Sequence, residues 1–196
     1  YKLSWHEKQE YNSNAQVMQI SREDYWYGNN THMQPMMVTK TNSMGKNMKV
    51  RMRYPNDFPP PVPADASLLI SKGMGGTPIE TLSIMDIGTN EYILGGSAIR
   101  YSLDPANLLY NNESYALNTG NKPIVFSAYT GLNDSRYELK QRTNRLNNFE
   151  QTAIPASART TTLWDSKRIN PLAQFTVPRF NDPTYNSFND IAFSGF

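Results

Sequence analysis

The clearest structural signal in the chain is the stretch Asn47-Met48-Lys49-Val50-Arg51-Met52-Arg53-Tyr54. After the first residue, apolar and cationic side chains alternate without a break. Because successive side chains of a β-strand point to opposite faces, this alternation predicts a strand with one apolar and one basic face. We expect the apolar face to contribute to the core.

Short apolar runs recur outward from this strand, separated by turn residues at spacings of roughly ten residues. Further strands are predicted at residues 15–20, 36–40, 67–71, 79–87, 123–129, 160–164 and 174–177. Residues 91–101 predict a hairpin, because Gly95-Gly96 can adopt the positive φ angles of a tight turn. Together these features predict a mainly β chain with an antiparallel β-sandwich or jelly-roll-like body.

One segment has helical rather than strand periodicity. Ser135 and Glu138 have the spacing of a capping box at a helix N-terminus. The apolar stripe that follows has helical spacing and consists of Leu139, Thr143, Leu146 and Phe149. The pattern predicts one helix near residues 135–150.

Prolines mark two extended segments. A Pro-rich connection at residues 54–65 lies inside the predicted β-rich body, which spans residues 1–170. Residues 171–196 predict an extended C-terminal arm that holds five of the eight Phe and few charges. Such a segment cannot bury its rings on itself, so we expect it to bind partner subunits. The predicted anchors are Phe180, Tyr185, Phe188, Phe193 and Phe196.

The composition excludes several function classes. The chain has 196 residues, a net charge of +2, only 18% charged residues and no cysteine. Disulfides, thiolate zinc sites and cysteine nucleophiles are therefore absent. The longest apolar runs hold only a few residues, whereas a membrane span needs about 20, so no membrane span is expected.

Two groups of basic residues are candidates for contact with nucleic acid or an acidic partner. The first lies on the basic strand face and comprises Lys49, Arg51 and Arg53. The second lies on the predicted helix and includes Arg136 and Lys140. A net charge of only +2 disfavours a dedicated nucleic-acid binder, and solvated faces are the simpler interpretation.

Two clusters suggest sites for small ligands, although packing in the core is the simpler interpretation of each. The aromatic run Tyr25-Trp26-Tyr27 could stack on a sugar ring. His32 and the methionines between Met33 and Met52 combine imidazole and thioether, which suit Cu(I). No nucleophile elbow, Walker motif or dinucleotide motif occurs, and the chain has two histidines. We therefore expect no cofactor and no enzymatic activity.

The Asn-rich, Tyr-rich, charge-poor and Cys-free composition is similar to that of many viral coat, linker and tail proteins. It is a likeness of class rather than of motif. The resulting hypothesis is a structural assembly protein located in a virus or bacteriophage particle, with copies of itself or other structural subunits as partners. The alternative is a secreted or periplasmic module that binds carbohydrate or, less favoured, copper.

Overall fold

The computed structural model describes residues 3–41, 46–146, 149–154, 159–165, 167 and 169–177. Their strands form one antiparallel sheet in which spatial order follows chain order, with β8 departing from it by pairing with β6. The strands are β1 (Trp5–Tyr11), β2 (Val17–Trp26), β3 (Met37–Thr41), β4 (Asn47–Arg53), β5 (Glu80–Ile87), β6 (Asn90–Leu103), β7 (Leu109–Leu117), β8 (Ile124–Val125), β9 (Tyr137–Leu146), β10 (Phe149–Ala153), β11 (Arg159–Trp164) and β12 (Pro171–Val177). The predicted mainly β, antiparallel body is confirmed.

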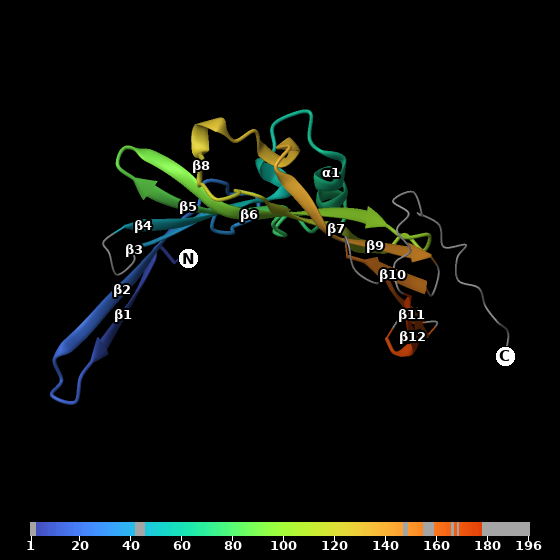
Figure 1. The fold of residues 1–196 in the computed structure, drawn as a ribbon, viewed down its shortest axis with the longest axis horizontal. Helices are drawn as coiled ribbons and strands as arrows, with labels where there is room; N and C mark the ends of the chain where they lie inside the picture. The colour runs from blue at the N-terminus through green and yellow to red at the C-terminus, as the bar shows by residue number, and fades with distance from the viewer. Residues whose placement is uncertain are drawn as a thin grey trace.

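The sheet is open and arched (Figure 1). The β1–β2 hairpin projects from one end of the arch, and the β11–β12 hairpin lies at the other end. The outermost strands of the described sheet are therefore β1 and β12. The strands form one continuous sheet that is not closed, so the second layer of the body is not made of a second sheet.

Short elements form that second layer over the middle of the sheet. They are η1 (Pro55–Asp57), α1 (Ala64–Ser71), η2 (Phe126–Ala128) and η3 (Gly131–Asn133). One buried cluster joins strands β5 to β8 and consists of Leu82, Ile84, Ile93, Leu117 and Ile124. A second cluster joins α1 to the residue preceding β5 and consists of Ala66, Leu69 and Ile79. The core thus lies over the central strands, and the hairpins at both ends extend beyond it.

The predicted helix near residues 135–150 is wrong. Residues 137–146 form β9, which pairs with β7 on one side and with β10 on the other. Leu146 and Phe149 lie opposite each other, so β9 and β10 form a hairpin. Helix propensity favours Glu, Leu, Lys and Arg by only a few tenths of a kcal/mol per residue, and hydrogen bonding to two neighbouring strands outweighs it. Among the described residues, α1 is instead the single α-helix.

The predicted strand at residues 67–71 is also wrong, because these residues belong to α1. The apolar run Leu68-Leu69-Ile70 has no period of its own, and such a run fits a buried helix as well as a buried strand. The Pro-rich connection predicted at 54–65 contains η1 and leads into α1. Pro63 is the N-cap residue of this helix.

The hairpin predicted around Gly95-Gly96 is replaced by an unbroken strand. β6 runs through both glycines and pairs with β5, with a shift of register between Ser83 and Ile84. A Cβ atom on Gly96 would lie 2.6 Å from Cδ2 of Leu82 and 3.1 Å from the carbonyl oxygen of Thr81. Gly96 therefore allows close packing between two strands rather than a turn.

The expected C-terminal arm begins as a strand of the sheet. Residues 171–177 form β12, antiparallel to β11. The rest of the expected arm lies outside the described residues, and with it the predicted anchors Phe180, Tyr185, Phe188, Phe193 and Phe196. Their role in binding partners stays a prediction.

Candidate functional site

The β1–β2 hairpin is the part of the described chain with the least cover. All seven residues of β1 are exposed. Large apolar side chains occur along both strands, and Trp5 is 49%, Tyr11 57% and Trp26 56% exposed. An isolated two-stranded hairpin is marginally stable in water, and exposed apolar surface of this kind marks interaction sites.

The turn of this hairpin is fixed by its own polar groups. Oδ1 of Asn12 accepts hydrogen bonds from the backbone N–H groups of Asn14 and Gln16, at 2.9 Å each. Ala15 has a φ of 58°, which is in the left-handed region. An Asn side chain that bonds to the backbone two residues on is a common turn device. The turn is therefore stabilised by local hydrogen bonds of Asn12.

Charged pairs run along the hairpin. Nζ of Lys8 lies 2.6 Å from Oε1 of Glu10, and the guanidinium of Arg22 lies 5.1 Å from the Trp5 ring. The hydrogen bond from Lys8 lowers the pKa of Glu10 and raises that of Lys8. Exposed ion pairs of this kind contribute little to the free energy of unfolding. Their main effect is on the pattern of charge that the hairpin surface presents.

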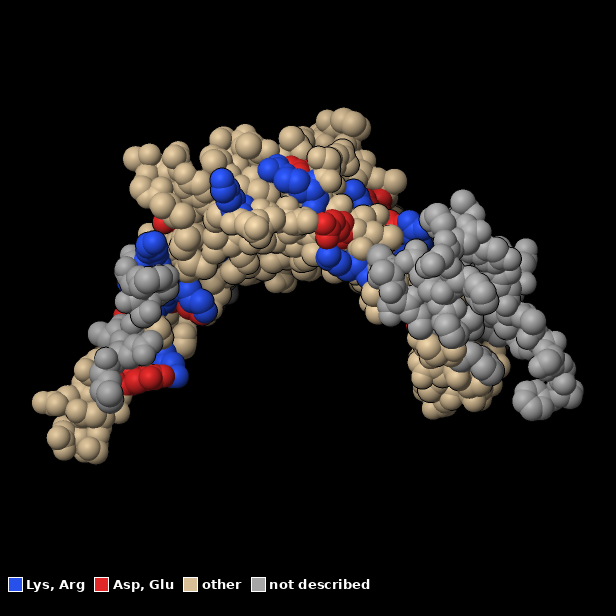
Figure 2. All heavy atoms as spheres, viewed as in Figure 1, with Lys and Arg blue, Asp and Glu red and all other residues tan. Residues whose placement is uncertain are grey.

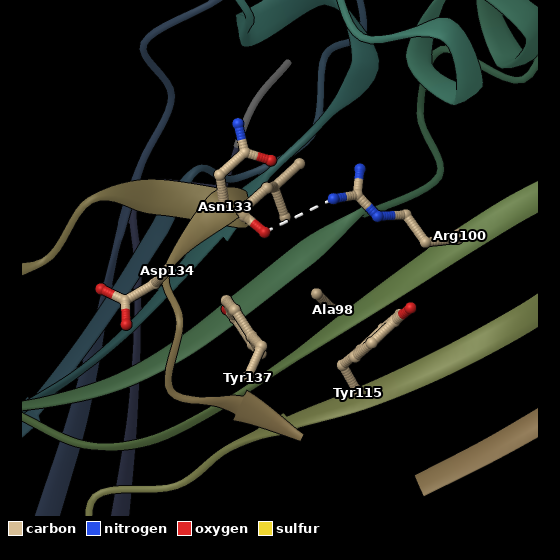
Figure 3. Close-up of a pocket in the computed structure, with 7 residues that line it drawn as sticks. Ala98, Arg100, Tyr115, Asn133, Asp134 and Tyr137 are labelled. Carbon is tan, nitrogen blue, oxygen red and sulfur yellow. Dashed lines mark hydrogen bonds between the residues drawn. The ribbon is translucent and has the colours of Figure 1, made fainter. Parts of the chain in front are cut away.

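Two adjoining pockets lie on the body beneath the covering loops. The larger, of about 550 Å³, is lined by residues 58–63 and 130–133, together with Arg53 and Arg100. The smaller, of about 230 Å³, is shown in Figure 3 and lies between Tyr115, Tyr137 and Asp134. Nη2 of Arg100 donates to the carbonyl oxygen of Leu132 at 3.4 Å across this pocket. Nη1 of Arg100 lies 3.3 Å from Asp65.

A buried carboxylate fixes the loop that lines both pockets. Asp134 accepts hydrogen bonds from the backbone and guanidinium of Arg136 and from Thr130. The Arg136 guanidinium holds the pKa of the Asp134 carboxyl well below its ordinary value, although burial opposes this effect. Arg136 also donates to the carbonyl oxygen of Ala128 at 2.9 Å.

A tyrosine pair holds the covering loop on the sheet in the same region. The hydroxyl of Tyr129 donates to the buried carboxylate of Glu80 and lies 2.9 Å from the hydroxyl of Tyr137. Burial, with the bond to Glu80, raises the pKa of Tyr129, and burial also raises that of Tyr137. Both hydroxyls therefore stay protonated near neutral pH and act as hydrogen-bonding groups rather than as bases.

Neither face of β4 is fully buried. On the basic face Lys49 and Arg53 are half-buried and Arg51 is exposed, while on the apolar face Val50 is exposed and Met48 and Met52 are half-buried. The expected contribution of the apolar face to the core is limited to Tyr54, which is buried directly after the strand.

Arg51 lies opposite the buried Leu82, and Lys49 lies opposite the buried Ile84. The guanidinium of Arg51 lies 5.1 Å from the Phe126 ring, and that of Arg53 lies 4.3 Å from the Phe58 ring. Long cationic side chains can cover apolar surface with their stems while their charged ends stack on rings.

Lys49 and Arg53 also have carboxylate partners inside the chain. Nζ of Lys49 lies 2.9 Å from Asp86 and 2.5 Å from Glu91. Nη1 of Arg53 lies 3.7 Å from Glu80. On the face of the molecule that Figure 2 shows, Lys and Arg side chains are spread along the body rather than gathered in one patch. A face of this kind lacks the concentrated charge typical of nucleic-acid binding.

The second predicted basic group is not brought together on a helix. Arg136 lies in the turn before β9, where it binds Asp134. Lys140 lies on β9 and pairs with Glu138 at 2.7 Å on the surface. Arg136 and Lys140 are thus each paired with a carboxylate of the chain, and the cationic helix surface expected for them does not form.

The structure places Tyr25 and Trp26 of the predicted sugar site on opposite faces of β2 and engages both ring nitrogens of His32, a predicted copper ligand. Tyr25 and Trp26 lie opposite Val38 and Met37, and successive residues of a strand point to opposite faces, so they do not form one stacking platform. His32 is buried, and Nδ1 accepts from the backbone N–H of Gln34 at 3.1 Å. Nε2 therefore carries the proton and donates to Asp57 at 3.2 Å, which leaves neither ring nitrogen free for a metal.

The described residues contain no group of three or more His, Asp or Glu side chains arranged to hold a metal ion. In the same part of the chain, no helix has the length and apolar character that crossing a lipid bilayer requires. Comparisons with protein-family models, with curated proteins and with solved structures each find no match.

Proposed function

We propose that this chain is a structural assembly protein that packs against neighbouring subunits through extended segments. The observation that carries the proposal is the β1–β2 hairpin, whose outer strand is exposed at all seven positions. Trp5 and Tyr11 are about half exposed in the described structure, and burial of both rings against a neighbour would remove this apolar surface from water. Hot spots of protein interfaces are enriched in these residue types.

The opposite end of the sheet supports the same function. Near β12, Ile169 is 67% and Leu172 is 65% exposed. Exposed apolar side chains at both ends of an open sheet are a liability for a soluble monomer, which natural proteins manage by covering or charging the edges. The predicted aromatic arm follows β12 directly in the sequence, so we propose that it is a second contact with a neighbour.

We propose a virus or bacteriophage particle as the setting for this assembly. The support comes from composition, since only 18% of the residues are charged and the net charge is +2. Many copies of such a chain can pack closely without large summed repulsion. The ligand-binding alternative has less support, because Tyr25 and Trp26 face opposite ways and both ring nitrogens of His32 are engaged.

Sedimentation velocity of the full chain tests the proposal. We expect species heavier than the 22.3 kDa monomer, increasing with concentration. The double variant Trp5→Ser/Tyr11→Ser should shift the distribution toward monomer. A matched control is Leu108→Ser, which removes a side chain that is 52% exposed but lies outside the hairpin, and it should leave the distribution unchanged.

Both hairpin rings are about half exposed, so their removal should change the free energy of unfolding by no more than about 1 kcal/mol. Loss of association would then not reflect loss of the fold. A wild-type chain that remains a monomer at every concentration would contradict the proposal. A hairpin variant that associates as strongly as the wild type would do the same.

A further inference from the structure

We infer that β1 is an interface strand and pairs antiparallel with β1 of a second copy of this chain, about a two-fold axis at Gln9. The inference rests on the proposed assembly function and names the partner and the register. Within the described residues, β1 pairs with β2 and with no other strand. Its second edge is therefore a template for another strand.

The hydrogen-bond pattern shows which groups this edge presents. The backbone N–H of Tyr25 donates to the carbonyl oxygen of Ser4 at 2.8 Å. Pairing continues from there without a shift as far as Glu10. Since hydrogen-bonded and non-hydrogen-bonded pairs alternate in an antiparallel ladder, the N–H and C=O groups of every second residue point away from β2. These residues are Trp5, Glu7 and Gln9.

Charge along β1 selects the register. Lys8 and Glu10 lie two residues apart on one face of the strand, and the 2.6 Å between their charged groups shows that both side chains lie along it. With Gln9 on the axis, Lys8 faces Glu10 of the second copy, and the two-fold axis repeats this pair. The strand is therefore complementary in charge to itself.

Neighbouring registers lack this complementarity. An axis at Lys8 would place two lysines opposite each other, and an axis at Glu7 or Glu10 would oppose two glutamates. Like charges directly opposite each other destabilise strand pairs. A head-to-tail contact with the other outer strand would be indifferent to these charges, because β12 contains no ionisable side chain.

Charge reversal in the full chain tests the inference by sedimentation equilibrium. Lys8→Glu should raise the dimer dissociation constant at least tenfold, and Glu10→Lys should do the same. The double variant Lys8→Glu/Glu10→Lys restores complementarity and should return the dissociation constant to within about threefold of the wild type. Lys40→Glu is the matched control, since Lys40 is an exposed lysine paired with a glutamate on β2.

A backbone variant supplies a second readout. Gln9→Pro removes an outward N–H while the ladder to β2 keeps its donors, and it should abolish the dimer. Unfolding curves of the same samples separate loss of pairing from loss of fold.

Association that resists both Lys8→Glu and Gln9→Pro would overturn the β1 pairing and leave the proposed function standing. Failure of the double variant to restore the dimer would also overturn it. A monomeric wild type would overturn both.

Discussion

Replacement of Asp134 by asparagine tests how the loop that lines both pockets is held. The carboxylate is buried and accepts three hydrogen bonds from Arg136 and two from Thr130. An amide of the same shape has one accepting oxygen. In its better orientation it keeps the bonds made to Oδ2 and loses the two that Arg136 donates to Oδ1.

Hydrogen bonds to a charged group contribute about 1.5–3 kcal/mol each. The Arg136 side chain is 35% exposed, so water replaces part of what is lost. We therefore expect Asp134→Asn to lower the free energy of unfolding by about 3 kcal/mol, near the lower end for two such bonds. Urea unfolding followed by circular dichroism, at concentrations where the chain is monomeric, measures the change.

The pH dependence of the same difference gives an independent check. Because the pKa of Asp134 is lower in the folded chain than its ordinary value of 3.8, its stabilising effect is complete above about pH 4. It is lost as the pH falls through the folded pKa. The difference in free energy of unfolding between the wild type and Asp134→Asn should therefore be largest near neutral pH and should decrease in acid.

The matched control is Asp24→Asn, which breaks a surface pair with Arg22 and should cost less than about 1 kcal/mol. A cost for Asp134→Asn as small as that of the control would refute the reasoning. A difference that stays constant from pH 7 into acid would refute it as well.

Four further substitutions have expected effects. Gly96→Ala should lower the free energy of unfolding by about 1–3 kcal/mol by overpacking β5 against β6, whereas Gly95→Ala, with nothing within 4 Å of the added carbon, should change it by less than about 1 kcal/mol in the same urea titration. Tyr129→Phe should cost about 2 kcal/mol because Glu80 loses a buried donor, and a smaller change than 0.5 kcal/mol would contradict that role. Ala15→Gly should raise the melting temperature slightly by removing left-handed strain of about 1 kcal/mol, and a fall would contradict it.

Strands with one covered face were predictable from the sequence. The alternation at residues 47–54 corresponds to β4, and the apolar run at 79–87 corresponds to β5. Burial on one face imposes a period of two on such strands. The partial burial of the cationic face of β4 was not predictable, because it depends on Arg53 and Arg51 stacking on the rings of Phe58 and Phe126.

Two hairpin segments, β1 and β9–β10, were missed. β1 contains two glutamates, a lysine, a histidine and a glutamine, and no burial imposes a pattern on it because all its residues are exposed. The β9–β10 hairpin was missed because β9 consists largely of good helix formers. The signal that could have found it is Asn147-Asn148, since asparagine tolerates the left-handed conformations of a two-residue turn.

The candidate assembly surface was missed for the same reason, since no burial within the chain imposes a pattern on its sequence. The exposed strand that carries no hydrophobic periodicity, β1, is the one that we propose contacts a second copy of the chain. Sequence patterning reports burial within a chain more readily than burial between copies, because residues of an interface must also remain soluble before assembly. The composition favoured an assembly protein as a hypothesis, whereas the exposed β1–β2 hairpin could be located only in the structure.

Hydrogen exchange of the β1–β2 hairpin tests the central claim most directly. The full chain is compared in dilute solution and at concentrations where it associates, with peptides covering residues 5–11 as the readout and peptides from β5 as the internal reference. The account predicts that exchange in β1 slows on association, while β5 stays equally protected in both states. Unchanged exchange in β1 in a fully associated sample would contradict it.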